Sequence, residues 1–331
     1  MQTPYRIRTD LQRVILDGYA YPLGVETACT RPVHEGYSVT WVEGEGDGPD
    51  TYTFFVVLSH ERLKPLLAAC FDRLPEQVAG IMEVGSRDAF RAVDVFLGAS
   101  AISIERFRSS WDRYDAIFLE DASLAIGVNT EAPFMEVFLD QDKRVTIHVE
   151  PDARPEIELL LNQQGLQEFD EQDLFVDEAD LDQTVVRPVM LEDPSLLCDV
   201  DQLLMALRHE WELVLDEDQD RNLDALGRNL GRTLWHAIII VEPCGGVTDG
   251  LAHAIVWSFA SSRSEVESLV RERLEDDTDW SFREFYTLDR VALDDRPESL
   301  VDLTPRHPRS EIFMLQIESV DDSGACEFDD G

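Results

Sequence analysis

Hydrophobic positions along the chain follow two periods, and each change of period predicts a new element. Residues 37–42 alternate weakly between apolar and polar side chains, and 51–58 form a strong β run, so a hairpin is expected around the loop EGEGDGPD. Over 63–74 apolar residues recur every three or four positions, which predicts a helix that Ser59 caps. Residues 80–84 are then expected to return as a strand.

A second stretch begins with a helix. Apolar residues recur every three or four positions over 104–118, and Ser103 is expected to cap that helix. A short apolar helix face over 157–161 closes the stretch, and Gly165 is expected to end that helix. Between the two helices, strands are predicted at 123–128, 134–139 and 144–149.

The third stretch again has two strands followed by a helix. Residues 235–241 and 252–259 predict a hairpin across the turn-rich sequence PCGGVTDG. Ser262 and Glu265 have the spacing of a capping box, and the apolar helix face over 266–274 follows them. Two further strands are expected at 282–293 and 312–317. The repeated order predicts an α+β protein whose antiparallel sheets are built from β-β-α units, with helices on one face.

The acidic residues divide the chain unevenly. Of the formal net charge of -40, residues 150–224 carry -19, against -9 for 1–149 and -12 for 225–331. Such a stretch attracts cations and basic surfaces and repels nucleic acid and anionic lipid. The expected partner is therefore a basic protein, and neither nucleic acid nor a membrane is expected to bind.

The clearest domain boundary is residues 166–186, which are rich in acids and contain no base. We interpret this segment as an acidic linker between an N-terminal α+β domain, 1–165, and a C-terminal one, 187–320. Its leucines and phenylalanines leave a second interpretation open, in which the segment docks on a basic groove. Residues 321–331 are predicted to be an acidic, disordered tail.

The cysteines argue for a reducing environment. The chain has five, far apart and without any CxxC pair, so neither a disulfide framework nor a zinc site is indicated. The N-terminal residues lack the apolar run of a signal peptide, and the strongest apolar run, 235–241, is too short to span a bilayer. The expected location is the cytoplasm.

One segment has the residue types of a calcium loop. Oxygen-bearing side chains alternate along it, at Asp216, Asp218, Asp220, Asn222 and Asp224. Calcium takes six to eight oxygen ligands in flexible geometry, which such a loop suits. The segment is not an EF-hand, because Arg221 replaces the turn glycine and Gly227 replaces the bidentate glutamate. The competing interpretation is an acidic turn between a strand at 211–215 and a helix that Asp220 or Asn222 caps.

The same segment permits an enzyme. Asp216 and Asp218 follow directly after the predicted strand at 211–215, where paired carboxylates could hold magnesium for phosphoryl or glycosyl transfer. Arg228 and Arg232, a few residues further on, could bind an anion. No GxSxG motif and no phosphate-binding P-loop occurs in the sequence.

The composition favours binding over catalysis. The leading hypothesis is a non-enzymatic acidic protein that engages a basic partner protein. The first alternative is a calcium- or magnesium-dependent module or enzyme centred on 216–224. The second is a salt-adapted protein whose acidity has no partner role.

Overall fold

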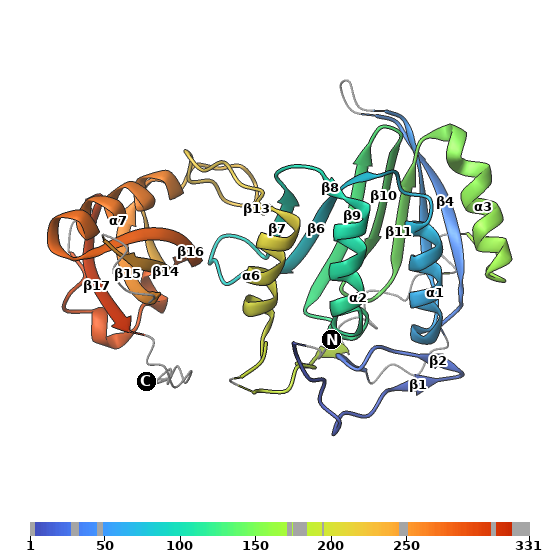
Figure 1. The fold of residues 1–331 in the computed structure, drawn as a ribbon, viewed down its shortest axis with the longest axis horizontal. Helices are drawn as coiled ribbons and strands as arrows, with labels where there is room; N and C mark the ends of the chain where they lie inside the picture. Colours follow the sequence, from blue (N-terminus) through green and yellow to red (C-terminus); the bar gives the residue numbers. More distant parts are fainter. Residues whose placement is uncertain are drawn as a thin grey trace. The chain divides into compact units, whose positions relative to one another are not determined.

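The chain forms two compact units, and each is built from discontinuous parts of the sequence. The computed structural model describes residues 4–27, 33–44, 49–170, 174, 184–193, 195–244, 251–305 and 309–319 (Figure 1). Unit 1 comprises Met1–Val84 and Val95–Leu215, and unit 2 comprises Gly85–Asp94 and Asp216–Gly331. The ten residues Gly85–Asp94, which are flanked on both sides by residues of unit 1, therefore belong to unit 2.

Unit 1 is organised around a nine-stranded sheet. Its order is β13-β7-β6-β9-β10-β11-β5-β4, with β8 paired to β6. The strands are β4 (Gly36–Val42), β5 (Thr51–Val57), β6 (Gln77–Gly85), β7 (Val93–Gly98), β8 (Ile102–Ser103), β9 (Leu124–Glu131), β10 (Phe134–Leu139), β11 (Val145–Val149) and β13 (Leu213–Leu215). Two small antiparallel pairs accompany it, β1 (Ile15–Leu16) with β2 (Tyr19–Ala20) and β3 (Val25–Thr27) with β12 (Thr184–Val186).

One face of this sheet is covered by helices. They are α1 (His60–Phe71), α2 (Ile104–Glu120), α3 (Arg154–Gln163), which follows the short helix η1 (Pro151–Ala153), and α6 (Val200–Trp211). Figure 1 shows α1 and α2 side by side against the sheet. Side chains alternate across a strand, so Val78 and Met82 of β6 join the helix-covered core. At Gly80 a Cβ would lie 2.6 Å from the Trp211 ring, so only glycine admits this close packing.

Unit 2 has the same two-layer design at a smaller size. Its sheet has the order β16-β14-β15-β17. The elements are β14 (Thr233–Pro243), β15 (Ala252–Ala260), α7 (Arg263–Asp277), β16 (Trp280–Val291), η2 (Leu293–Asp295), η3 (Glu298–Leu300) and β17 (Glu311–Ser319). Val266, Val270 and Leu274 of α7 are fully buried in one core with Ile239 and Ala254.

The helix caps follow local rules to different degrees. The Ser103 hydroxyl accepts the Arg106 amide at 3.2 Å, as expected of an N-cap. Ser262 accepts the Glu265 amide at 3.2 Å, but the Glu265 carboxylate accepts from the Ser261 amide, one residue before the position that a capping box uses. Ser59 precedes α1, yet its hydroxyl accepts the Ala20 amide and donates to Glu61 instead of capping the helix.

The expected α+β class and the antiparallel sheets are confirmed. The repeated β-β-α unit is not confirmed as an organising pattern, since three strands follow α2 in succession and α6 adds a helix outside that order. Two details of the sequence analysis are wrong. Trp211 is the last residue of α6 and not the start of a strand, and no helix begins within the described residues 216–232.

The described parts of 166–186 lie in unit 1. The Gln167 carbonyl accepts the Tyr37 amide of β4, and Leu166 and Leu174 are buried. The unit boundary follows Leu215, while 171–173, 175–183 and the tail from 320 onward lie outside the described residues. The linker and the disordered tail therefore stay predictions. No helix in the described ranges is long and apolar enough to cross a membrane.

Candidate functional site

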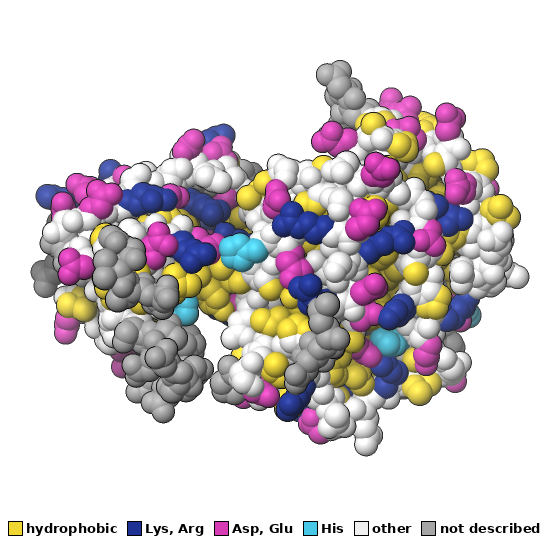
Figure 2. Space-filling model, in the orientation of Figure 1, with side chains coloured by type: hydrophobic (Ala, Val, Ile, Leu, Met, Phe, Trp, Pro, Cys, Tyr) yellow, Lys and Arg dark blue, Asp and Glu magenta, His cyan; other side chains and the backbone are white. Residues whose placement is uncertain are grey.

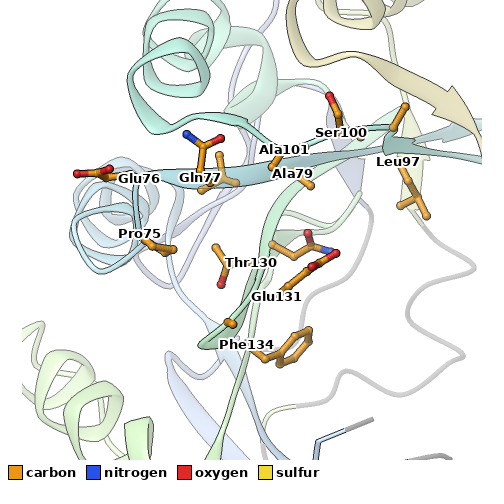
Figure 3. Close-up of a pocket in the computed structure, with 16 residues that line it drawn as sticks. Pro75, Glu76, Gln77, Ala79, Leu97, Ser100, Ala101, Thr130, Glu131 and Phe134 are labelled. Atoms are coloured by element: carbon orange, nitrogen blue, oxygen red, sulfur yellow. The ribbon is translucent and has the colours of Figure 1, made fainter. Parts of the chain in front are cut away.

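A pocket of about 910 Å³ lies in unit 1, among β6, β7, β9 and β10 and the turns beside them (Figure 3). Much of its lining is small, with Ala79 from β6, Gly98 from β7, and Ala99 and Ala101 from the turn after β7. Short side chains over a sheet leave space that larger residues would fill. The volume falls within the range of about 300–1,000 Å³ that is typical of ligand pockets.

Strand register places the polar lining on the face away from the helices. Leu124, Ile126 and Val128 of β9 point into the helix-covered core, so the residues that alternate with them point to the opposite face. Asn129 and Glu131 alternate with these core residues and therefore lie together on the face of the sheet away from the helices. Figure 3 shows Glu131 and Phe134 beside each other at one end of the pocket.

The turn between β9 and β10 holds these two side chains. Phe134 pairs directly with Glu131 across the hairpin, so the two side chains leave the sheet on the same face. The Thr130 hydroxyl donates to the Pro133 carbonyl at 2.6 Å and accepts the Met135 amide at 3.1 Å. These bonds fix the turn from which Glu131 and Phe134 project.

A polar row continues from the pocket across the sheet. Asn129 pairs with Glu136, Glu136 with His148, and His148 with Thr53. A hydrogen bond of 2.8 Å joins His148 Nδ1 to Thr53 Oγ1, and His148 Nε2 lies 3.9 Å from Glu136 Oε1. Burial, followed by the nearby charge of Glu136, raises the pKa of Glu83. The face beside the pocket is therefore polar and acidic.

The charged side chains that line the pocket are all carboxylates. They are Glu76 and Glu131, and no lysine, arginine or histidine is among the lining residues. Within the part of the chain that the structure describes, neither carboxylate pairs with a basic side chain. On the visible face of unit 1, by contrast, acidic side chains lie interspersed with basic ones (Figure 2).

Glu120 shows how a buried acid of unit 1 is paired. Arg13 donates to its carboxylate, the Leu23 amide donates at 2.7 Å, and His60 Nε2 lies 3.1 Å away. Burial opposes ionisation of this group, but the hydrogen bonds from His60, Arg13 and Leu23 outweigh it and lower the pKa of Glu120 to about 2. The pocket glutamates have no such partners.

Most of the predicted calcium residues make hydrogen bonds within the protein. Asn222 is buried, and its amide donates to the Gly231 carbonyl at 2.9 Å and to Thr233 Oγ1 at 2.8 Å. Its amide oxygen accepts from Arg290 at 2.8 Å. That oxygen, the atom that would bind calcium, faces a cation already present in the protein.

Three of the four predicted aspartates also accept hydrogen bonds within the protein. Asp218 accepts the Asp220 amide at 3.1 Å, Asp220 accepts from Ser264 at 2.8 Å, and Asp224 accepts from Arg228 at 2.7 Å. Among the described residues, no three or more histidine, cysteine, aspartate or glutamate side chains converge in a way that could hold a metal ion. The calcium or magnesium site at Asp216, Asp218, Asp220, Asn222 and Asp224 stays a prediction.

Two features escaped the sequence analysis. Glu217, within the predicted segment, accepts from Arg91 and from Arg263, the latter at 3.2 Å. Glu131 and Phe134 were not singled out, although the predicted strands on either side of a short turn already suggested that they lie close together.

The sequence pattern around these two residues does not predict the pocket itself, because its small lining residues come from β6, β7 and the turn that follows β7.

Comparison with known proteins gives no relative: no family model, no curated protein and no solved structure matches the chain.

Proposed function

We propose that this protein binds a basic partner protein and that the partner's cationic side chains enter the pocket of unit 1. The observation that carries the proposal is the pocket's charge. Its acidic lining residues are Glu76 and Glu131, and neither is paired with a base among the described residues. A cation that enters the pocket forms a more favourable interaction with an unpaired carboxylate than with a carboxylate that is already bonded to arginine.

The charge of the whole chain supports the same partner class. A formal net charge of -40 attracts basic surfaces over distances near the Debye length and raises the rate of encounter. Nucleic acid and anionic lipid are disfavoured by the same field. The overall charge attracts a basic partner but does not position it, and contacts with the pocket glutamates would do so.

We place this function in the cytoplasm. The described cysteines, Cys70, Cys198 and Cys244, are all free, which agrees with a reducing compartment. Binding without catalysis is the simpler interpretation of the pocket, since its lining pairs no carboxylate with a nucleophile or a general base.

The experiment is titration calorimetry of the full chain with a synthetic peptide of mixed lysine, arginine, glycine and serine. Replacing both pocket acids, Glu76→Gln with Glu131→Gln, is expected to weaken binding about tenfold, or roughly 1.4 kcal/mol, because two attractive charges are removed from a hollow. The matched control is Asp112→Asn with Asp152→Asn, which removes the same charge from exposed positions in α2 and η1.

The control is expected to change the affinity less than about twofold, since neither of its residues lines the pocket and an isolated surface charge contributes little. Equal weakening by both double variants would reduce the interaction to net charge and contradict the proposal. A peptide that does not bind the unaltered protein would reject it outright.

A further inference from the structure

We infer that the pocket selects the guanidinium of an arginine side chain over the ammonium of lysine, an inference that rests on the proposed binding of a basic partner. The juxtaposition behind it is an aromatic ring, Phe134, directly across the β9–β10 hairpin from a carboxylate, Glu131. Both line the pocket at one end (Figure 3).

The protein itself repeatedly completes this pair with an arginine. The Arg154 guanidinium lies 4.3 Å from the centre of the Tyr52 ring, and its Nε donates to Glu158 at 2.6 Å. Ring, guanidinium and carboxylate thus form a triad in unit 1. Two triads of the same composition occur in unit 2, Arg271–Phe282–Glu267 and Arg290–Phe90–Asp88.

The pocket holds such a triad without its arginine. No arginine of the described residues lies over the Phe134 ring or pairs with Glu131. Phe134 is half-buried and lines the pocket, so part of its side chain remains accessible to a ligand. The missing member of the triad is the group that a partner would supply.

The geometry of the site favours arginine for two reasons. A planar guanidinium can lie against the ring while its in-plane N–H groups reach a carboxylate, whereas an ammonium is a compact and strongly hydrated charge. Asn129 lies two residues before Glu131 on the same face of β9, and its amide oxygen can accept a second N–H.

Small residues provide the room for the side chain. Ala79 pairs with Asn129 across β6 and β9, so a methyl group stands where a larger side chain would fill the hollow. Glu76, at the opposite end of the pocket from Phe134 in Figure 3, has no aromatic neighbour among the lining residues. It therefore attracts either kind of cation and serves as the internal control.

The test compares three peptides that differ only at three positions, which hold arginine, lysine or citrulline. Citrulline keeps the planar group and lacks the charge. Each peptide is titrated into the full-length protein. We expect the arginine peptide to bind at least about fivefold more tightly than the lysine peptide, and the citrulline peptide to bind more weakly than either.

The preference for arginine should disappear in Phe134→Leu and in Glu131→Gln and persist in Glu76→Gln. Unchanged melting temperatures would show that the variants fold. Equal binding of the arginine and lysine peptides, or a preference that survives Phe134→Leu, would overturn the inference and leave the proposed function standing. If neither charged peptide binds the unaltered protein, the proposed function fails together with the inference.

Discussion

In unit 2 the carboxylate of Asp88 is fully buried and bonded to Arg290, whereas in unit 1 the carboxylate of Glu131 is exposed at the pocket and bonded to no base among the described residues. Arg290 donates to Asp88 from both its backbone amide, at 2.8 Å, and its side chain, at 2.7 Å. Both acids add one negative charge to the total. If Glu131 binds a cation as we propose, the presence or absence of a basic partner within the protein distinguishes a binding acid from a structural one, and the total number of acids does not.

The buried pair also explains why ten residues from within the unit 1 sheet belong to unit 2. Asp88 lies in the segment Gly85–Asp94, and Arg290 lies near the end of β16. In the same segment, Arg91 pairs with Asp94 at 2.9 Å and donates to Glu217. Residues 216–331 alone would leave Arg290 without its carboxylate.

The largest expected effect is on stability. Asp88→Asn should lower the free energy of unfolding by about 3 kcal/mol or more, because a buried arginine loses its counter-charge and an amide NH₂ cannot accept its N–H groups. Glu131→Gln should change it by less than about 0.5 kcal/mol, as is usual for exposed positions. Urea unfolding of the full chain measures both. Similar losses of unfolding free energy in the two variants would contradict the distinction between a buried, paired acid and an exposed, unpaired one.

The second effect depends on pH. Burial, followed by the charge of Asp94, raises the pKa of Asp289 to about 6, against opposition from Arg87. Because the folded state holds this proton more tightly than the unfolded state, the group's contribution to stability falls as pH rises from about 4 to about 6. Asp289→Asn removes that loss, so the variant should gain stability relative to the unaltered protein across this window.

Thermal unfolding at several pH values checks the sign. Asp294→Asn, at an exposed position in η2, is the control for removal of one charge from the same unit. A difference between Asp289→Asn and the unaltered protein that stays constant from pH 4 to pH 7 would contradict the assignment.

The smallest expected effect is that of calcium. Asn222 and three of the four predicted aspartates already accept hydrogen bonds within the protein. We therefore expect millimolar calcium, compared with a chelator at equal ionic strength, to shift the melting temperature by less than about one degree. A rise of several degrees that Asp216→Asn with Asp218→Asn abolishes would instead establish the predicted metal site and give these acids a binding role as well.

The elements were predictable where neighbours in sequence share a face. The spacing over 104–118 and the cap at Ser103 predict α2 correctly, because helix periodicity and capping involve residues within one or two turns. The helix α6 was missed, and Trp211 was assigned to a strand although its ring packs against Gly80 of β6. That contact joins distant parts of the chain and leaves no periodic signal.

The sequence by itself determined the α+β class and most of the strands and helices, since these depend on short-range alternation of apolar and polar side chains. Only the tertiary structure decided which acids are neutralised. Asp88 and its arginine are 202 positions apart, and Asn222 finds the same arginine 68 positions away, so no local pattern could distinguish a buried partner from a metal ligand. The pocket likewise arises only where strands distant in sequence bring small residues together beside Glu131. Coulombic pairing acts through space, whereas sequence patterns record only what is near along the chain.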